Sequence, residues 1–179
     1  MHRTFLLEKL NNHIAHDQEE REMLGRIIQF VNEYEDCFKR ELSVGHITGS
    51  AWIVNHERSH VLLTHHKKLN RWLQLGGHSD GDPNTLAVAL KEGKEESGLV
   101  VSPVSEAVFD VDVHLIPARK QEPDHYHYDV RFLLEADSQI PFVVSEESHD
   151  LAWVALEELP NLVDERSLLR MLEKTLAMQ

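Results

Sequence analysis

Residues 76–99 of this 179-residue chain read GGHSDGDPNTLAVALKEGKEESGL, and this stretch gives the strongest indication of the fold. Residues 83–96 are predicted to form a helix, because Asp82 can cap the free N–H groups of a first turn and proline fits the first helical position. Gly98 follows, at the place where helices commonly end in a left-handed residue. The two glycines that open the stretch predict a turn that brings bare backbone close to the helix.

Three carboxylates share one face of this predicted helix. Glu92, Glu95 and Glu96 stand at i, i+3 and i+4, so their side chains are neighbours and repel one another unless a positive charge lies among them. Hard oxygen ligands gathered in this way suit Mg²⁺ or Mn²⁺, and the carbonyl of Gly77 in the glycine turn can add a further ligand. A solvated acidic helix face is the alternative interpretation of the glutamates taken alone.

The glycines around these carboxylates make the pattern more specific. The segment resembles the Nudix box, which runs glycine, five residues, glutamate, seven residues, Arg-Glu, an apolar residue, any residue, Glu-Glu, any residue, glycine and an apolar residue. Gly77 stands at the first glycine, Glu92 at the glutamate of Arg-Glu, and Gly98 and Leu99 at the end of the box. The resemblance extends over roughly residues 45–160.

The resemblance implies a magnesium-dependent hydrolase that cuts the diphosphate linkage of a nucleoside diphosphate joined to another group. Glu92, Glu95 and Glu96 would then hold the metal, together with Gly77. In that family the base that activates water can be a box glutamate, here Glu95, or a glutamate on a loop before the last strand. Glu146 and Glu147 lie in such a loop, and we favour Glu147 as the base.

Three positions depart from the family pattern. Pro83 replaces the first glutamate and Lys91 replaces the arginine, a pair that commonly braces the loop against the helix in the family. We expect Asp80 or Asp82 to reach Lys91 instead, and Lys91 is also a candidate for substrate binding. Gly93 replaces an apolar residue inside the helix at a cost of about 1 kcal/mol relative to alanine, and we expect another backbone to approach closely there.

Two segments after the box alternate between polar and apolar residues and predict neighbouring strands. The polar side chains of the first are Asp110, Asp112 and His114, and those of the second are His125, His127, Asp129 and Arg131. If the strands are antiparallel, pairing His114 with His127 also pairs Asp110 with Arg131. The same register sets Asp112 opposite Asp129, which is costly unless a histidine, a cation or solvent intervenes.

The polar side of these strands has three interpretations. It can be the wet face of a sheet, or it can form the wall of a pocket that recognises the part of the substrate beyond the diphosphate. The candidate substrate-binding residues in that pocket are Asp112, His114, His127, Asp129 and Arg131, with His78 at the rim. A transition-metal site built from His114, His125 and His127 is a third possibility without a distinctive spacing.

The remaining elements predict an α/β fold, a Nudix-type α/β/α sandwich with a mixed β-sheet. HITGSAWIVN and VLLTHH, separated by a polar turn, predict a hairpin; LAWVAL predicts a last strand, and an amphipathic helix follows Asp164. Strands and helices interleave without a regular βαβ rhythm, which favours a mixed sheet with helices on both faces. Residues 1–44 are predicted to be an N-terminal helical extension, packed on the main domain of residues 45–179 or on a second subunit in a homodimer.

Composition narrows the class of partner. The chain has 18 basic and 31 acidic side chains and a formal charge of −13, so we expect neither a nucleic-acid duplex nor an anionic membrane as a partner. A small phosphorylated, nucleotide-like substrate remains compatible, because a divalent cation can invert the local field. The single cysteine, Cys37, excludes an internal disulfide, and the sequence shows no long apolar run, so we expect a cytoplasmic protein.

Two other functions share features with this interpretation. A non-catalytic sensor of a nucleotide-like ligand is one, although such modules usually lose the box glutamates that this chain keeps. An enzyme resembling isopentenyl-diphosphate isomerases is the other. Those enzymes resemble Nudix proteins and need a catalytic cysteine, and Cys37 lies far from the box in the sequence.

Overall fold

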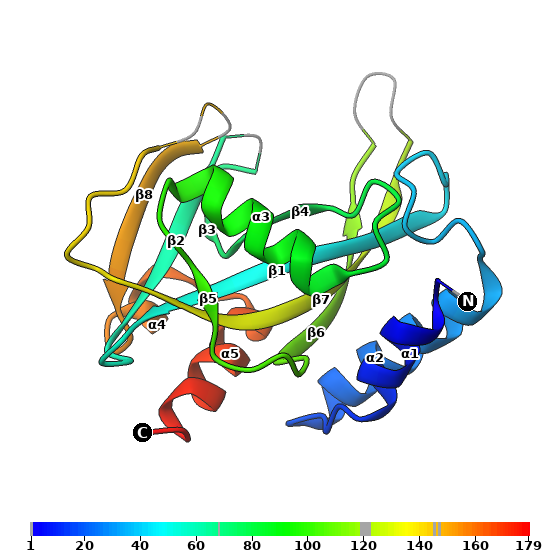
Figure 1. Ribbon diagram of the computed structural model, residues 1–179, viewed down its shortest axis with the longest axis horizontal. Coiled ribbons are helices and arrows are strands. Elements are labelled where there is room, and N and C mark those ends of the chain that lie inside the picture. The colour runs from blue at the N-terminus through cyan, green and yellow to red at the C-terminus, as the bar shows by residue number, and fades with distance from the viewer. Residues whose placement is uncertain (1, 68, 119–122, 145, 147) are drawn as a thin grey trace.

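The computed structural model describes residues 2–67, 69–118, 123–144, 146 and 148–179, and Figure 1 shows how its elements are arranged. The helices are α1 Thr4–Asn11, α2 Gln18–Glu33, α3 Thr85–Ser97, α4 Leu159–Leu162 and α5 Arg166–Leu176. The strands are β1 Gly45–Asn55, β2 His60–His66, β3 Arg71–Leu73, β4 Leu75–His78, β5 Ser102–Pro103, β6 Asp110–Ile116, β7 His125–Ala136 and β8 Ser148–Ala155. Among the described residues, no helix combines the length and the apolar character needed to cross a lipid bilayer.

A mixed sheet with β1 near its centre forms the middle layer. Strand β1 pairs in parallel with β7 along its whole length, from Gly45 opposite Tyr126 to Asn55 opposite Ala136. Its other edge is antiparallel to β2 near one end and to β4 near the other. Strand β6 extends the sheet beyond β7, and β3 and β8 both pair with β2. The mixed sheet and the predicted hairpin of β1 and β2 are therefore confirmed.

Alternate side chains of β1 pack into two separate apolar cores, one on each face of the sheet. Ile47, Ala51 and Ile53 belong to the core that α3 covers. Trp52 and Val54 point the other way, into a core completed by α4 and α5. The period of two along a strand thus places a helical layer on each face, as the sequence predicted. Figure 1 shows α3 running across β1, with α5 below the sheet in red.

The N-terminal helices complete the core on the α3 side. Leu6 and Leu10 of α1 and Ile27 of α2 are fully buried in the same cluster as the sheet residues that face α3. The Phe30 ring stacks on the Tyr128 ring of β7, with the ring centroids 3.8 Å apart. Residues 1–44 therefore pack on the sheet rather than enclosing a core of their own.

Helix α3 begins later than predicted. It starts at Thr85 with Asn84 as its N-cap, because the Asn84 side chain accepts a hydrogen bond of 3.1 Å from the N–H of Ala87. The prediction of a start at 83 capped by Asp82 was wrong, since the Asp82 carboxylate instead accepts from the N–H of Asn84 and forms a turn before the helix. The end at Gly98, with φ of 71°, is confirmed.

A buried ion network fastens α5 to β6. Asp110 is fully buried and accepts hydrogen bonds of 2.8 and 2.9 Å from Arg170 and of 2.8 Å from Lys174, while Arg131 lies 3.4 Å away. Burial works to lower the pKa of Arg170, but Asp110 outweighs it and raises the pKa. Charges removed from water in this way are stabilising only while all partners are present.

Replacing Arg170 by alanine should therefore lower the free energy of unfolding by about 3–5 kcal/mol, because Asp110 stays buried with fewer partners. The matched control is Arg166→Ala on the same helix, where a partly exposed arginine pairs with Asp17 and Glu173. That change should cost about 0–1 kcal/mol. Urea unfolding followed by circular dichroism gives both values, and equal losses would contradict the role assigned to Arg170.

Candidate active site

A close approach of backbones sets the distance between α3 and the sheet. A Cβ atom on Gly49 would lie 2.6 Å from the carbonyl oxygen of Thr85, so only glycine lets the start of α3 rest on β1. The close backbone contact expected at Gly93 is not found. A Cβ there would meet the side chains of Ile53 at 3.3 Å and Ala51 at 3.6 Å. Gly93 is therefore a packing position, and the backbone contact lies at Gly49.

The glycine turn of β4 receives two of the three predicted metal ligands. A Cβ atom on Gly77 would lie 2.6 Å from the carboxyl carbon of Glu92, and the N–H of Gly76 points to the Glu96 carboxylate at 3.4 Å. The Glu92 side chain is 18% exposed and that of Glu95 is 59% exposed. Glu92 and Glu96 thus face bare backbone, while Glu95 extends further into solvent. Carboxylate oxygens beside a backbone cradle are the donor set that suits Mg²⁺ or Mn²⁺.

Lys91 lies among the glutamates rather than on the loop. Its Nζ atom is 3.5 Å from a Glu92 oxygen and 3.6 Å from a Glu95 oxygen, and these carboxylates, Glu92 first, raise the pKa of Lys91. The expected contact of Lys91 with Asp80 is absent, because Arg40 binds both oxygens of Asp80 at 2.5 and 2.6 Å. An arginine from the segment before β1 therefore braces the loop, and no spacing in the sequence would have identified it.

The structure describes only one of the two loop glutamates that were proposed as the base. Glu146 is exposed, and its carbonyl accepts a hydrogen bond of 2.5 Å from Lys67. Glu147 lies outside the described residues. The segment that leads to both is fastened to the end of α3, because the N–H of Val143 donates to the carbonyl of Ser97 at 2.7 Å.

The register predicted for the two alternating strands is confirmed. His114 pairs with His127, Asp110 with Arg131, and Asp112 with Asp129. The cation that makes the last pair tolerable is Arg131, whose Nε donates to Asp129 at 2.8 Å and whose Nη2 donates to Asp112 at 3.3 Å. Burial works to raise the pKa of Asp112, but Arg131 outweighs it and the pKa falls to about 2.

Asp129 and Arg131 are enclosed, whereas the outer members of the row reach solvent. The Asp129 carboxylate is buried and also accepts from Thr48 at 2.8 Å, Ser50 at 2.7 Å and Gln74 at 3.2 Å. The side chain of His114 is 35% exposed and that of Asp112 is 14% exposed, and the two contact each other at 3.3 Å. Any ligand on this face would therefore meet His114 and Asp112 before it met the buried pair.

Five histidine rings from four strands form one cluster on this face. His46 pairs with His127 across β1 and β7, and their ring centroids are 4.8 Å apart. His78 lies 4.8 Å from His46, and His114 lies 5.5 Å from His127. His46 was not among the site residues predicted from the sequence. The alternation of His46, Thr48 and Ser50 marks a polar side of β1, but its parallel pairing with β7 is invisible in the sequence.

The inner histidines of the cluster are held neutral. Burial first, and then the neighbouring rings of His78 and His125, lower the pKa of His46 to about 4. Burial and the rings of His114 and His46 lower the pKa of His127 to about 2. Both rings therefore keep an unprotonated nitrogen at neutral pH.

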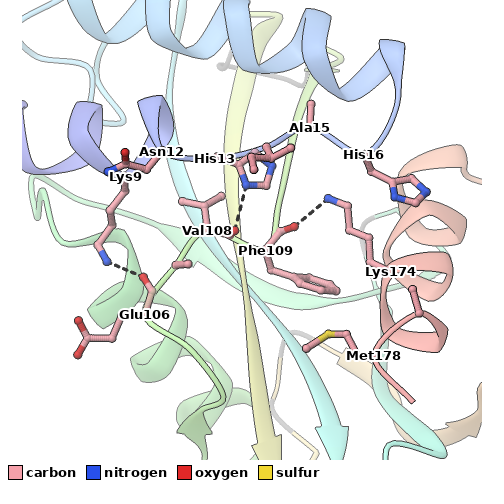
Figure 2. A pocket seen from close by; sticks show the side chains of 13 residues that line it. Lys9, Asn12, His13, Ala15, His16, Glu106, Val108, Phe109, Lys174 and Met178 are labelled. Carbon is pink, nitrogen blue, oxygen red and sulfur yellow. Dashed lines mark hydrogen bonds between the residues drawn. The ribbon is translucent and has the colours of Figure 1, made fainter.

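A groove lies apart from these residues, between the α1–α2 turn and α5 (Figure 2). It encloses about 720 Å³ and is lined mainly by apolar surface from His13, Ile14, Val108, Phe109 and Met178. Lys174 reaches its edge and donates to the Phe109 carbonyl. None of the predicted site residues lines this groove.

Comparison with known proteins identifies the arrangement. The family model described as NUDIX domain matches residues 46–173. A NUDIX-family hydrolase from Clostridium perfringens is 26% identical, with a TM-score of 0.54 over 75% of this chain and 98% of that chain. A MutT NUDIX hydrolase from Burkholderia pseudomallei is 23% identical, with a TM-score of 0.55 over 71% of this chain and 95% of that chain. An Ap4A hydrolase from C. elegans is 17% identical, with a TM-score of 0.59 over 74% and 96%. No curated protein matches the chain.

Adding a methyl group at Gly77 tests whether the bare backbone of this residue positions the Glu92 carboxylate. Gly77 lies outside the left-handed region, so alanine is tolerated by the backbone, but its Cβ would displace the Glu92 carboxylate. We expect Gly77→Ala to weaken Mn²⁺ binding at least about tenfold, as for the loss of groups that orient metal ligands. The signal of free Mn²⁺ in electron paramagnetic resonance measures this affinity. The control is Gly25→Ala on the exposed side of α2, where a Cβ meets nothing within 4 Å. Equal affinities would show that Gly77 does not position Glu92.

Proposed function

Since the chain belongs to the NUDIX domain family of hydrolases, we propose that it is a Mg²⁺-dependent enzyme that cleaves the diphosphate linkage of a nucleoside diphosphate joined to another group. The observation that carries this proposal is the pair of carboxylates, Glu92 and Glu96, turned toward the bare backbone of Gly76 and Gly77. Mn²⁺, another hard cation, can serve in the same place.

The residues present fit such an ion. Glu92, Glu95 and Glu96 would supply oxygen ligands from one helix face, and the backbone of Gly77 lies beside the Glu92 carboxylate. Small side chains at the turn leave room for the phosphates of the substrate. When bound, Mg²⁺ supplies positive charge that neutralises the diphosphate oxygens and stabilises charge that develops on the leaving phosphate.

The chain itself supplies the remaining steps. A carboxylate must take a proton from the attacking water, and Glu147, Glu146 and Glu95 are the candidates, with Glu147 favoured. The attachment of Val143 to the end of α3 supports a loop base, because it brings this segment to the helix that carries the box. Lys91, whose ammonium group lies among the box glutamates, is placed to contact a substrate phosphate.

The polar face of β6 and β7 is proposed to recognise the part of the substrate beyond the diphosphate. His78 follows Gly77 directly in β4 and its ring contacts that of His46, so the end of this short strand connects the glycine turn to the histidine cluster. His114 and Asp112 reach solvent and can contact that part of the molecule, with His127 beneath them. Asp129 and Arg131 act by positioning these groups from below.

Loss of single box carboxylates tests the reaction. Hydrolysis should require Mg²⁺ or Mn²⁺, and Glu95→Gln or Glu96→Gln should lower kcat by at least about 10²-fold with little change in melting temperature. Lys94→Ala, on the exposed side of the same helix, is the control and should keep wild-type kcat. The assay uses dinucleotides, nucleotide sugars and ADP-ribose with and without EDTA. Full activity in EDTA, or in either glutamine variant, would refute the proposal.

Replacing His114 by alanine tests specificity. A site that hydrogen-bonds a substrate group rejects analogues that lack this group, because its own polar atoms are left unpaired. His114→Ala should therefore change the ranking of substrates in kcat/KM, with at least about a tenfold change for one substrate relative to another. Glu95→Gln should slow all substrates alike, because the diphosphate is common to them. Uniform slowing by His114→Ala, or no effect, would mean that this face is merely solvated.

A further inference from the structure

Three histidines of β1 and β7 offer ligand atoms to a common point. Nitrogen atoms of His46, His125 and His127 all lie within 4.8 Å of one another. The arrangement follows from the sheet, because His46 is the direct partner of His127 in the parallel ladder, and His125 precedes it by two residues on the same face. These residues belong to neither the glycine turn nor the box helix.

The inner rings lack the partners that buried polar groups normally have. Among the described residues, neither ring nitrogen of His46 has a hydrogen-bond partner, and Nε2 of His127 has none. His46 is almost fully buried, so water does not readily replace those partners. Buried polar atoms in native proteins are nearly always satisfied, and each exception calls for an explanation. A ligand that accepts electron pairs from several imidazoles at once would give a partner to one nitrogen of His46 and to Nε2 of His127.

The third ring is oriented by its backbone surroundings. Nδ1 of His125 lies 3.0 Å from the carbonyl oxygen of Pro123. A carbonyl can only accept, so His125 donates its Nδ1 proton, and its Nε2 keeps a free electron pair. A histidine ring oriented by a backbone carbonyl is the usual support of a metal ligand.

The protonation of the inner rings agrees with this role. A metal ion needs the neutral form of imidazole, and burial among other rings lowers the pKa of His46 to about 4 and that of His127 to about 2. The two rings therefore need not lose a proton before they bind a cation at neutral pH.

We propose that His46, His125 and His127 bind one transition-metal ion, with Zn²⁺ as the expected occupant, at a site separate from the box glutamates. Imidazole nitrogens favour zinc, nickel and copper over magnesium, which prefers oxygen ligands. Nitrogen ligands of tetrahedral zinc, each at about 2.0 Å, lie about 3.3 Å apart, so these nitrogens, now within 4.8 Å of one another, would move closer together when the ion binds. The fourth position is left for water or for the neighbouring ring of His78.

The ion would join the first residues of two parallel strands. His46 is the second residue of β1, and His125 is the first residue of β7. The site therefore links strands that are distant in the sequence, at the end of the ladder where fraying begins. Zinc binding should raise the melting temperature, because the ion binds only the folded state. This effect does not depend on catalysis, so the proposal does not rest on the function proposed above.

The test uses the full chain without a histidine tag, stripped of metal with EDTA and exchanged into buffer with excess Mg²⁺. The Mg²⁺ occupies the carboxylates, so added Zn²⁺ reports on the histidines. Competition against a chromogenic zinc indicator should give one equivalent of tight binding, and Co²⁺ should give the visible absorption of a four-coordinate site. His46→Gln and His127→Gln should weaken zinc binding by more than about 100-fold, since each removes a ligand outright.

Two controls separate this site from other zinc-binding positions. His56→Gln changes an exposed histidine in the turn after β1, and Glu96→Gln changes the carboxylate site. Both should keep the wild-type zinc affinity. If the buried-ring variants do not fold, as judged by circular dichroism, His125→Gln provides the same test at a less buried ring and should also weaken binding.

Three results would overturn the proposal. Wild-type protein that binds no zinc in the presence of Mg²⁺ would do so, and so would zinc binding that survives His125→Gln and the other histidine variants unchanged. Zinc binding lost in Glu96→Gln but kept in the histidine variants would assign the ion to the box helix. A kcat defect in Glu96→Gln with intact zinc binding would leave the proposal standing and test only the catalytic function.

Discussion

Arg131 holds a positive charge inside the protein among three aspartates, and the polar face of the sheet depends on it. Its guanidinium group donates to Asp129 of its own strand and to Asp112 and Asp110 of β6. Without it, Asp112 and Asp129 would face each other in a register that the apolar side of the strands also requires. Asp110 also accepts hydrogen bonds from Arg170, so this network links the candidate specificity face to the C-terminal helix α5.

Successive residues of strand β4 face opposite sides of the sheet, so the strand contacts the box glutamates on one side and the histidine cluster on the other. Gly77 faces α3 and receives the Glu92 carboxylate, while the next residue, His78, points to the other face and meets His46. A hard-oxygen donor set and an imidazole cluster thus lie on opposite sides of the same short strand. The two sets of donor atoms therefore share no residue, and hard oxygen atoms and imidazole nitrogens suit different classes of cation.

Features set by local sequence patterns could be predicted, whereas most contacts between distant segments could not. The alternation on β6 and β7 and the need to match Asp110 with Arg131 were enough to predict the register, because both are properties of paired strands. The start of α3 was misplaced, because Asp82 and Asn84 can both cap and only the folded turn decides between them. Arg40 and Asp80 are separated by 40 positions in the sequence, and His46 and its partner His127 by 81. Contacts between residues so far apart leave no periodic pattern in the sequence.

The N-terminal helices show that the limits of sequence similarity differ from the limits of the folding unit. The family match starts at residue 46, yet Glu20 of α2 is buried and accepts hydrogen bonds from Lys174 of α5 and from the N–H of Val111. A fragment trimmed to the match, residues 46–173, would uncover the apolar faces of β6 and β7 and would lose both Glu20 and Lys174. Thr175, which accepts the indole hydrogen bond of Trp52, would be lost at the other boundary. The helices that lie outside the family match thus contribute to the core that stabilises the sheet.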